Sequence, residues 1–262
     1  MTSPAELALA TDAANFRLGN EAYGLLGATF VRNTQTPHIY DANHVADARP
    51  TTEGEIDAFL EAIEREYQAS NHRRFDTDHR TPPEFAARLA LEGFERYDGL
   101  IFLLEGDLIG GAPACDIRPI ETEADWDGYW ELHLQNWLEH QERLKRPPNE
   151  EIARSMLMSH RLKQPPVQYF MAYVMEKPVA YFNSWAGIDG VGQVEDLFTA
   201  PEHRKKGYAE ALIHHCVADA RAKGAGPVVI AADPTDTPKQ IYARMGWRPV
   251  ALHTKYTKVL NK

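Results

Sequence analysis

A basic segment of small residues that precedes an amphipathic stretch is the clearest chemical feature of this sequence. Residues 194–209 read VEDLFTAPEHRKKGYA, an acidic and apolar strand, a proline turn and then the pattern Arg204-x-x-Gly207-x-Ala209. The first amides of a helix lack intrahelical partners and the helix dipole favours anions there, so a loop without bulky side chains suits a pyrophosphate. Neither of the two commoner phosphate loops is present, since no GxxxxGK[ST] occurs and no GxGxxG follows a predicted strand.

The sequence on either side of this loop alternates between strand and helix patterns. The predicted elements are, in order, a strand over residues 192–199, a helix over 208–223, a strand over 227–232, a short helix over 237–245 and extended segments within 250–259. Gly224 is a good stop signal for the first helix, and Pro238 falls in the first turn of the second, where a missing N–H is tolerated. This half of the chain is therefore expected to be one mixed α/β domain.

The loop and the end of this region resemble the GCN5-related N-acetyltransferase (GNAT) superfamily. The acetyl-CoA loop of that family has the signature [Q/R]-x-x-G-x-[G/A], and its recurring Tyr-x-x-x-Gly-Phe is similar to YARMGW at residues 242–247. The GNAT core also has this order of elements: strand, phosphate loop, helix, strand, helix, strand. The resemblance covers about residues 115–262 and implies acetyl transfer from acetyl-CoA to an amine without a metal.

The resemblance also implies which residues contact acetyl-CoA. In this family the pantetheine lies like an extra strand beside the strand before the loop, and the loop surrounds the pyrophosphate. The residues implied are Leu197, Phe198, Thr199, Arg204, Lys205, Lys206, Gly207, Tyr208, Ala209, Glu210 and Thr235. Thr235 stands where the family often has an asparagine that contacts the cofactor. For Lys205 and Lys206 a solvated basic surface is the alternative interpretation.

Two further side chains are implied to move protons. Tyr242 matches the family's general acid, because a phenol with an ordinary pKa of about 10 is protonated at neutral pH and can protonate a departing thiolate. Packing of the aromatic ring is its alternative role. Glu195 and Asp196 are neighbours on a strand and so point to opposite faces. We expect Glu195 to be the base that relays the amine proton through water, while structural hydrogen bonding is the alternative for both carboxylates.

Charge is divided unevenly along the chain. Residues 1–115 contain 9 Arg, no Lys and 19 Asp plus Glu, whereas the remainder contains 19 residues of each sign. An acidic front half argues against nucleic acid as a partner, since phosphate neutralisation needs a basic face. It permits a cationic acceptor, which the summed field would attract, and it equally serves solubility.

The front half repeats the pattern of the back half without the loop. The predicted elements are a helix over residues 53–69, a strand at HRRFDTD, a helix over 81–93 and a strand over 99–104. TPPEFAARLALEGF parallels TPKQIYARMGW, but DARPTTEG, which precedes the first helix, has no Arg-x-x-Gly-x-Ala and places acids where a pyrophosphate would bind. We interpret this half as a GNAT-like domain that has lost cofactor binding; an unrelated small α/β domain is the alternative.

These patterns predict a tandem organisation. At 262 residues the chain exceeds one GNAT domain and suits two modest ones. The expected α/β (α+β) fold has two GNAT-like mixed-sheet domains, a degenerate one over residues 26–112 and a complete one over 113–262, joined near GGAPA. Residues 1–25 are expected to be helical and to cap the front domain. A fragment from Cys115 onward is expected to contain the complete cofactor site.

The remaining signals exclude other chemistry. Cys115 and Cys216 form no CxxC or metal pattern and are expected to be reduced thiols, and neither His133 nor His140 has partners that complete a metal set. No apolar stretch spans a bilayer and no secretion signal opens the chain, so a soluble, cytoplasmic protein is expected. Aromatic residues within 126–143 belong to helices that wall the acceptor pocket in GNAT proteins, although core packing explains them equally well.

The function expected is acetyl-CoA-dependent N-acetylation of a small primary amine by direct attack in a ternary complex, with no covalent enzyme intermediate. Two alternatives remain open. One is a non-catalytic sensor or scaffold that binds acyl-CoA, and the other is an acetyltransferase whose acceptor is a peptide or protein. The sequence does not choose among aminoglycoside-like antibiotics, polyamines, amino-acid derivatives and peptides, nor does it indicate the oligomeric state.

Overall fold

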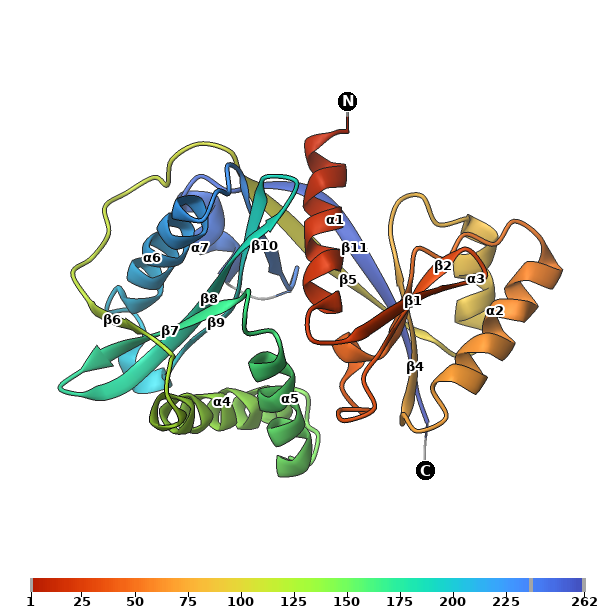
Figure 1. The fold of residues 1–262 in the computed structure, drawn as a ribbon, viewed down its shortest axis with the longest axis horizontal. Helices are drawn as coiled ribbons and strands as arrows, with labels where there is room; N and C mark the ends of the chain where they lie inside the picture. The colour runs from red at the N-terminus through yellow and green to blue at the C-terminus, as the bar shows by residue number, and fades with distance from the viewer. Residues whose placement is uncertain (1, 236–237, 261–262) are drawn as a thin grey trace.

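A single mixed sheet runs through the molecule. The computed structural model describes residues 2–235 and 238–260. Within them eleven strands follow the order β1-β2-β3-β4-β11-β5-β10-β9-β8-β7-β6 (Figure 1). The strands are β1 (Glu21–Leu25), β2 (Ala28–Arg32), β3 (His44–Ala46), β4 (His72–Thr77), β5 (Glu95–Leu104), β6 (Asp116–Pro119), β7 (Gln168–Val174), β8 (Lys177–Ile188), β9 (Val191–Thr199), β10 (Val228–Ala232) and β11 (Arg248–Val259). The predicted mixed α/β class is confirmed.

Helices cover the sheet on both faces in the back half. The helices are α1 (Pro4–Arg17), α2 (Glu53–Glu66), α3 (Pro83–Leu91), α4 (Glu123–Arg143), α5 (Glu150–Leu162), α6 (Tyr208–Ala222) and α7 (Pro238–Arg244), with short 3-10 turns η1 (Tyr40–Ala42) and η2 (Pro201–His203). One face carries α6 and α7 over a core that includes Phe182 and Val228, and the opposite face carries α4 over Tyr169 and Tyr181 (Figure 1). In the front half, α2 and α3 pack against a separate core around Phe75.

Local signals explain where several helices begin and end. The hydroxyl of Thr52 accepts from the amide of Glu55, and the carboxylate of Glu55 accepts from the amide of Thr52, which is a capping box for α2. Gly207 precedes α6, and the helix ends two residues before Gly224, the predicted stop. The short helix predicted over 237–245 corresponds to α7, although Thr237 lies outside the described residues.

The N-terminal helix is placed differently from the prediction. It ends at Arg17, and residues 21–25 form β1 instead of continuing a helical segment. It contacts the front half, where Arg17 pairs with Asp47 and Phe16 packs against His44, but it is not confined to it. Ala8 and Leu9 pack against Ile101 of β5 and against Val191 and Val229 of the back half, so α1 lies across the strands that join the two halves (Figure 1). The small residues on this helix let it approach the sheet closely.

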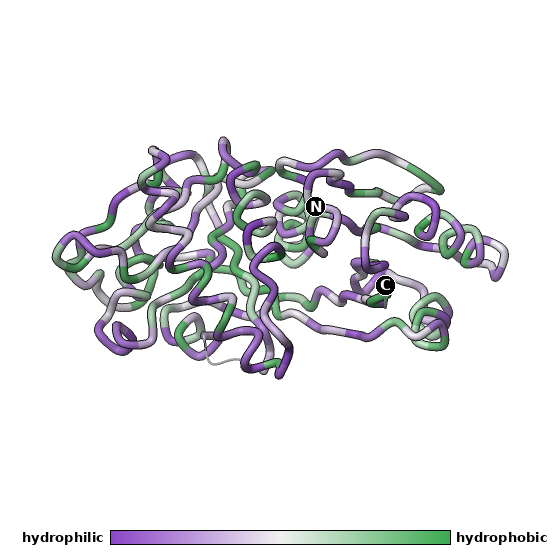
Figure 2. The backbone as a smooth tube through the Cα atoms, turned by 90° about the horizontal axis from the view of Figure 1, so that it is seen from below, coloured by the Kyte–Doolittle hydropathy of each residue, from purple (hydrophilic) through white to green (hydrophobic). Residues whose placement is uncertain are grey.

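The two halves exchange their last strands. Front-half β5 lies between β10 and β11, and back-half β11 lies between β5 and β4. All three pairings are antiparallel: Val228 is opposite Leu104, Lys255 is opposite Tyr97, and Val259 is opposite His72. In Figure 1 these two long strands connect the lobes, and Figure 2 shows the same two lobes from below with hydrophobic segments running through the larger one.

This exchange bears on two expectations about the back half, that it is a complete domain and that a fragment from Cys115 onward contains the complete cofactor site. The sheet of the predicted complete domain is completed by β5 of the front half, and Phe102 and Leu104 of that strand belong to the back-half core. A fragment that begins at Cys115 would therefore lack the strand that joins β10 to β11. Residues 105–115, which contain the predicted boundary at GGAPA, form no helix or strand, and the boundaries themselves stay predictions.

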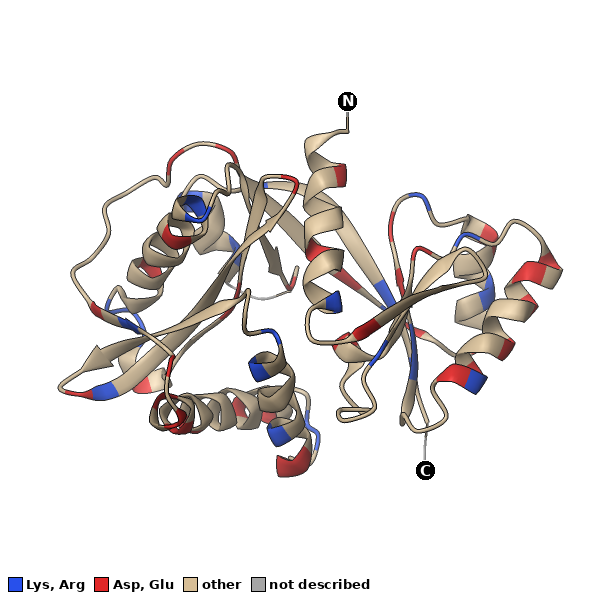
Figure 3. Ribbon diagram, viewed as in Figure 1, with Lys and Arg blue, Asp and Glu red and all other residues tan. Residues whose placement is uncertain are grey.

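The acidic excess of the front half is concentrated on its outermost helix. Six carboxylates and one guanidinium lie on α2 (Figure 3): Glu53, Glu55, Asp57, Glu61, Glu64, Arg65 and Glu66. Three of these carboxylates form ion pairs within the front half, Asp57 with Arg88, Glu64 with Arg73 and Glu66 with Arg32. The others contribute to a general negative field. Among the helices described, none is both long and apolar enough to cross a membrane.

Candidate functional site

Strands β9 and β10 separate partway along their length. They pair in parallel only at Val228 opposite Gly192 and at Val229 opposite Gln193. On its other side, β9 carries a bulge against β8, where two residues of β9 stand opposite one of β8, and Asp196 takes a φ of 63° there. A bulge bends a strand and re-aims its side chains. The end of β9 is therefore free to leave β10, and an opening forms in the middle of the sheet.

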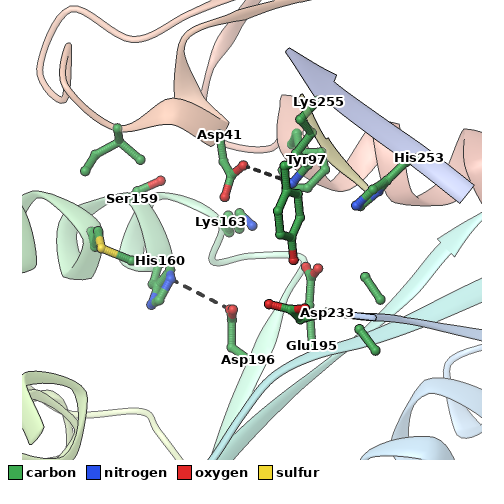
Figure 4. Close-up of a pocket in the computed structure, with 15 residues that line it drawn as sticks. Asp41, Tyr97, Ser159, His160, Lys163, Glu195, Asp196, Asp233, His253 and Lys255 are labelled. Carbon is green, nitrogen blue, oxygen red and sulfur yellow. Dashed lines mark ion pairs between the residues drawn. The ribbon is translucent and has the colours of Figure 1, made fainter. Parts of the chain in front are cut away.

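Two cavities meet at this opening. The first, which we call the slot, has a volume of about 150 Å³ and is lined by Phe182, Asp196, Leu197, Ile230, Ala231, Ala232, Asp233, Pro238 and Tyr242. The second, the junction pocket, has about 200 Å³ and is lined by Phe16, Ile39, Asp41, Tyr97, Met156, Ser159, His160, Lys163, Glu195, Asp196, Ala231, Ala232, Asp233, His253 and Lys255 (Figure 4). The slot lies within the back half, whereas both halves and α1 contribute to the junction pocket. Four residues line both cavities, so the two are adjacent.

The predicted anion loop leads directly into α6. Gly207 occupies the N-cap position with a φ of 88°, a left-handed conformation that favours glycine, and no side chain caps the helix there. The first amides of α6, from Tyr208 to Glu210, are therefore not covered by a capping side chain. Lys205 and Lys206 are exposed, and within the described chain neither forms an ion pair. A Cβ at Gly207 would lie 3.3 Å from Pro113 of the connecting segment.

Arg204 is held away from the mouth of the loop. Its Nε donates to the Thr199 carbonyl oxygen at 3.0 Å and its Nη2 donates to Oε2 of Glu139 on α4 at 2.5 Å, while its guanidinium lies over the Phe198 ring. These contacts fasten the loop to the end of β9 and to α4. The geometry favours a positioning role for Arg204 over direct phosphate binding.

The other predicted cofactor residues divide between the two faces of β9. Leu197 lines the slot. Phe198 is buried on the opposite face, with its ring 5.6 Å from that of Tyr181. Thr235 lines neither cavity, and both its amide and its hydroxyl donate to Oδ1 of Asp233, at 2.7 and 2.6 Å. The structure thus places Leu197 at the opening, whereas neither the loop residues 204–210 nor Thr235 line the two cavities.

Tyr242 reaches the slot from α7. The side chain is 4% exposed, and its ring packs 6.2 Å from Phe102 of β5 and 6.3 Å from Trp247. Packing on both sides restricts the ring, which is what a phenol needs if its hydroxyl is to stay aimed at one point. The ring is therefore a packed aromatic that also lines the slot, and its role as a proton donor stays a prediction.

Glu195 and Asp196 lie where the two cavities meet. Glu195 lines the junction pocket, and Asp196 lines both cavities. Asp196 accepts from Nδ2 of Asn183 at 3.0 Å, and Nε2 of His160 lies 3.7 Å from it. Burial and the charge of its neighbour Asp196 raise the pKa of Glu195 to about 8, and burial also raises the pKa of Asp196. Burial lowers the pKa of His160 to about 3, so this ring is neutral at pH 7.

Several pocket residues could not be found from motifs. Asp41 comes from η1, Tyr97 from β5, Lys163 from the end of α5 and Lys255 from β11 (Figure 4). Burial opposes ionisation of Asp41, but Lys255 and Arg74 hold its pKa well below the ordinary value. Burial and a hydrogen bond with Asp233 raise the pKa of Tyr97 to about 12. These residues are far apart in the sequence, and the exchange of β5 and β11 brings two of them, Tyr97 and Lys255, to the pocket.

The aromatic residues of α4 serve mainly as core. Trp126 and Tyr129 are buried beside Tyr169, and neither lines the junction pocket. Core packing, the alternative stated for them, is what they provide. Both cysteines are free, and burial raises the pKa of each thiol, most strongly that of Cys216. Among the described residues no group of His, Cys, Asp or Glu side chains is arranged to hold a metal ion.

Comparison with known proteins gives matches at two levels. Residues 126–247 match the model of the Acetyltransferase (GNAT) family, while no curated protein matches the sequence. A GCN5-related N-acetyltransferase from Kribbella flavida is similar in structure with a TM-score of 0.71 at 18% identity, over 98% of this chain and 96% of that one. A functionally unknown conserved protein from Staphylococcus epidermidis also has a TM-score of 0.71, at 15% identity over 92% and 95%.

A third structure bears on the tandem arrangement. It is a tandem GNAT protein from the clavulanic acid biosynthesis pathway, with a TM-score of 0.58 at 15% identity, over 81% of this chain and 72% of that one. Identities this low carry information about the fold alone. The fold match extends over both halves of the chain, beyond the residues that the family model covers.

Proposed function

We propose that this chain, which belongs through residues 126–247 to the GNAT acetyltransferase family, transfers the acetyl group of acetyl-CoA to a primary amine of a small molecule. The acyl donor enters on the side of the slot and the acceptor enters through the junction pocket. The amine attacks the thioester directly, and no acyl-enzyme forms. The front half supplies part of the acceptor pocket and no second donor site.

The observation that carries this proposal is the meeting of the two cavities at the opening between β9 and β10. Tyr242 lies on the slot side and Glu195 on the junction side, with Asp196, Ala231 and Ala232 between them. A reaction between two bound molecules needs their reacting atoms to be held together in one place. Two adjoining cavities with a proton donor in one and a carboxylate in the other meet that need.

The residues present fit acetyl-CoA. Beyond Gln193 the edge of β9 that faces β10 has no pairing with it, and an extended amide-containing arm can bind such an edge as an added strand does. The uncapped start of α6 after Gly207, with Lys205 and Lys206 beside it, suits the pyrophosphate. Acetyl-CoA supplies the thioester, and the chain supplies binding and proton transfer.

Proton transfer follows from the positions of the two side chains. As the new C–N bond forms and the C–S bond breaks, the amine loses a proton and the thiolate gains one. Glu195 accepts the amine proton, directly or through water, and its raised pKa brings it closer to the working pH of a general base. Tyr242 donates a proton to the departing sulfur. Atoms and charges balance when the two side chains exchange protons with solvent after each turnover.

Two other functions are weighed against this one. A non-catalytic acyl-CoA sensor would not require a second cavity with a carboxylate beside the slot. A peptide or protein acceptor would require a groove that is open along its length, whereas the junction pocket has about 200 Å³ and is bounded by both halves and α1. A small acceptor is therefore favoured.

An acceptor screen tests the proposal. The full chain is incubated with acetyl-CoA and single amines from several chemical classes, and both free CoA and the N-acetylated product are measured. We expect release of CoA that depends on the amine and equals the product formed. A protein that binds acetyl-CoA, as measured by calorimetry, but releases CoA with none of the amines would be a sensor and would overturn the proposed activity.

A further inference from the structure

We propose that the acceptor is an amine that also carries a carboxylate, an amino-acid-like zwitterion, and that Lys163 binds this carboxylate. This inference rests on the proposed function, since it names the substrate class of the junction pocket. It departs from the expectation of a purely cationic acceptor that the acidic front half permits.

Lys163 is a buried ammonium with an incomplete set of partners. It follows the last turn of α5, is 8% exposed and lines the junction pocket. Its Nζ donates to Oδ1 of Asn15 at 2.6 Å and lies 5.8 Å from the centre of the Phe16 ring. Within the described residues no carboxylate oxygen lies within 4 Å of it. The charge of Lys163 acts on Glu195 and Asp196 and lowers their pKa values against the rise that burial causes. Lysine has three donors, however, and the one hydrogen bond of Nζ within the described residues goes to a neutral amide.

Two of the nearby carboxylates, Asp41 and Asp233, have other hydrogen-bond partners. Asp41 accepts from Nη1 of Arg74 at 2.7 Å and lies 3.5 Å from Nζ of Lys255. Asp233 accepts from Thr235, on the opposite side of the pocket. In Figure 4 Lys163, which lines the pocket, lies between Asp41 on one side and Glu195 and Asp196 on the other.

The pocket therefore has two electrically different ends. Glu195 and Asp196 form the end next to the slot, where an amine must lie to attack the thioester. Lys163 and Lys255 line the junction pocket but not the slot, and Lys255 lies on the side of β11. A small molecule with an ammonium at one end and a carboxylate at the other is complementary to this arrangement. An acceptor with only positive charges would leave Lys163 unpaired and repelled.

Substitutions at two positions separate recognition from structure. Lys163→Met keeps an unbranched side chain that is one atom shorter and removes its charge. Asn15→Asp places a carboxylate 2.6 Å from the ammonium. This carboxylate of the protein takes the place of the carboxylate that the ligand would provide. Lys223→Met is the matched control, because Lys223 is an exposed lysine paired with Asp219 on α6, away from the pocket.

The experiment measures binding and turnover for pairs of amino acids and their carboxamides. Binding is followed by calorimetry with the full chain, so it does not depend on catalysis, and turnover is followed by CoA release. For the unaltered chain and for Lys223→Met we expect a preference for the acid of about 10- to 100-fold, the range of a hydrogen bond to a charged group. Lys163→Met and Asn15→Asp should both reduce this preference to within about threefold, while binding of the carboxamide changes little. Asn15→Asp should also raise the melting temperature.

Equal binding of acids and carboxamides by the unaltered chain would overturn the proposal. The proposal would also be overturned if Lys163→Met weakened binding of an amino acid and of its carboxamide equally. That result is expected of a lysine that only balances the charge of Glu195 and Asp196. A different result would overturn the proposed activity alone. If amino acids bind in a manner that depends on Lys163 but no amine releases CoA, the binding class stands and the acetyl transfer does not.

Discussion

At the scale of single residues, the site depends on side chains that lie on opposite sides of one opening. Tyr242 is fixed by packing against Phe102 and Trp247, and Glu195 stands next to Asp196 at the bulge of β9. Two neighbouring carboxylates in a shared pocket cannot both ionise easily. Their raised pKa values and the confined phenol are therefore consequences of where the backbone places them.

Tyr242→Phe tests the proton donor. The change keeps the ring and its packing, so binding of acetyl-CoA should survive, whereas turnover should fall by roughly 10²- to 10⁴-fold. Lower turnover with intact binding is typical of an interaction made mainly in the transition state. Tyr23→Phe, which removes a hydroxyl that bonds Glu66 far from the slot, serves as the control. Full turnover of Tyr242→Phe when chemistry limits the rate would assign the proton to another donor or to water.

The pH dependence tests Glu195. A base must be deprotonated to accept a proton, so kcat/KM should rise with pH through the pKa of the base, which burial and Asp196 raise to about 8. Glu195→Gln should lower kcat/KM and remove this limb, measured with the same acceptor between pH 6 and pH 10. Glu61→Gln, at an exposed carboxylate of α2, should leave the profile unchanged. A limb that persists in Glu195→Gln would belong to the acceptor amine or to Asp196.

The sequence predicted part of the site at this scale and missed another part. Tyr242, Glu195 and Leu197 could be placed because they belong to motifs whose spacing is local. Lys163, Asp41 and Lys255 could not, since each is an isolated charged residue whose role depends on which distant elements meet. Thr235 illustrates the opposite case, because its position in the sequence predicted a contact but its hydroxyl is already bonded to Asp233.

At the scale of elements, the central feature is the loop from β9 to α6. The proposed anion site combines a strand that leaves its neighbour, a glycine in a left-handed conformation and an uncapped helix start. Each of these parts has a local signal in the sequence, which explains why the bounds of α6 and β10 follow the prediction to within one residue at each end. The bulge at Asp196 has no such signal.

Gly207→Glu tests this site. A ligand that binds only the folded chain raises its melting temperature by mass action. The substitution adds bulk and negative charge where the phosphates approach, so acetyl-CoA should no longer raise the melting temperature of the variant. Gly224→Glu is the matched control, because Gly224 also has a left-handed φ, 105°, at the other end of the same helix, and a Cβ there meets no atom within 4 Å. The control should show the same strain and keep the shift. An undiminished shift in Gly207→Glu would place the cofactor elsewhere.

At the scale of the whole molecule, the exchange of β5 and β11 makes the halves dependent on one another. The patterns of GLIFLL and of residues 250–259 predict a strand and extended segments, but such a pattern is the same whichever neighbour a strand pairs with. The partners of β5 are chosen by long-range packing, for example of Phe102 against Tyr242. For this reason the mixed α/β class could be predicted and the single continuous sheet could not.

Separated halves test this dependence. A fragment over residues 113–262 should be insoluble or unfolded when expressed alone, because β10 and β11 would expose the edges that β5 covers. Co-expression with residues 1–112 should restore a soluble complex that binds acetyl-CoA, since the cut falls in a segment without helix or strand. A folded, active 113–262 fragment would contradict the structural role given to β5.

Direct transfer at the opening between β9 and β10 is tested most directly by single turnover with acetyl-CoA labelled in its acetyl group. The full chain is mixed with less than one equivalent of labelled acetyl-CoA, with and without an acceptor found in the screen. The label is then measured in the protein, in the amine and in acetyl-CoA. We predict that without acceptor the label stays in acetyl-CoA, and that with acceptor it passes to the amine in equal amount to the CoA released. Label that becomes covalently attached to the protein and then moves to the amine would contradict the ternary complex, and label that never reaches any amine would contradict the enzyme.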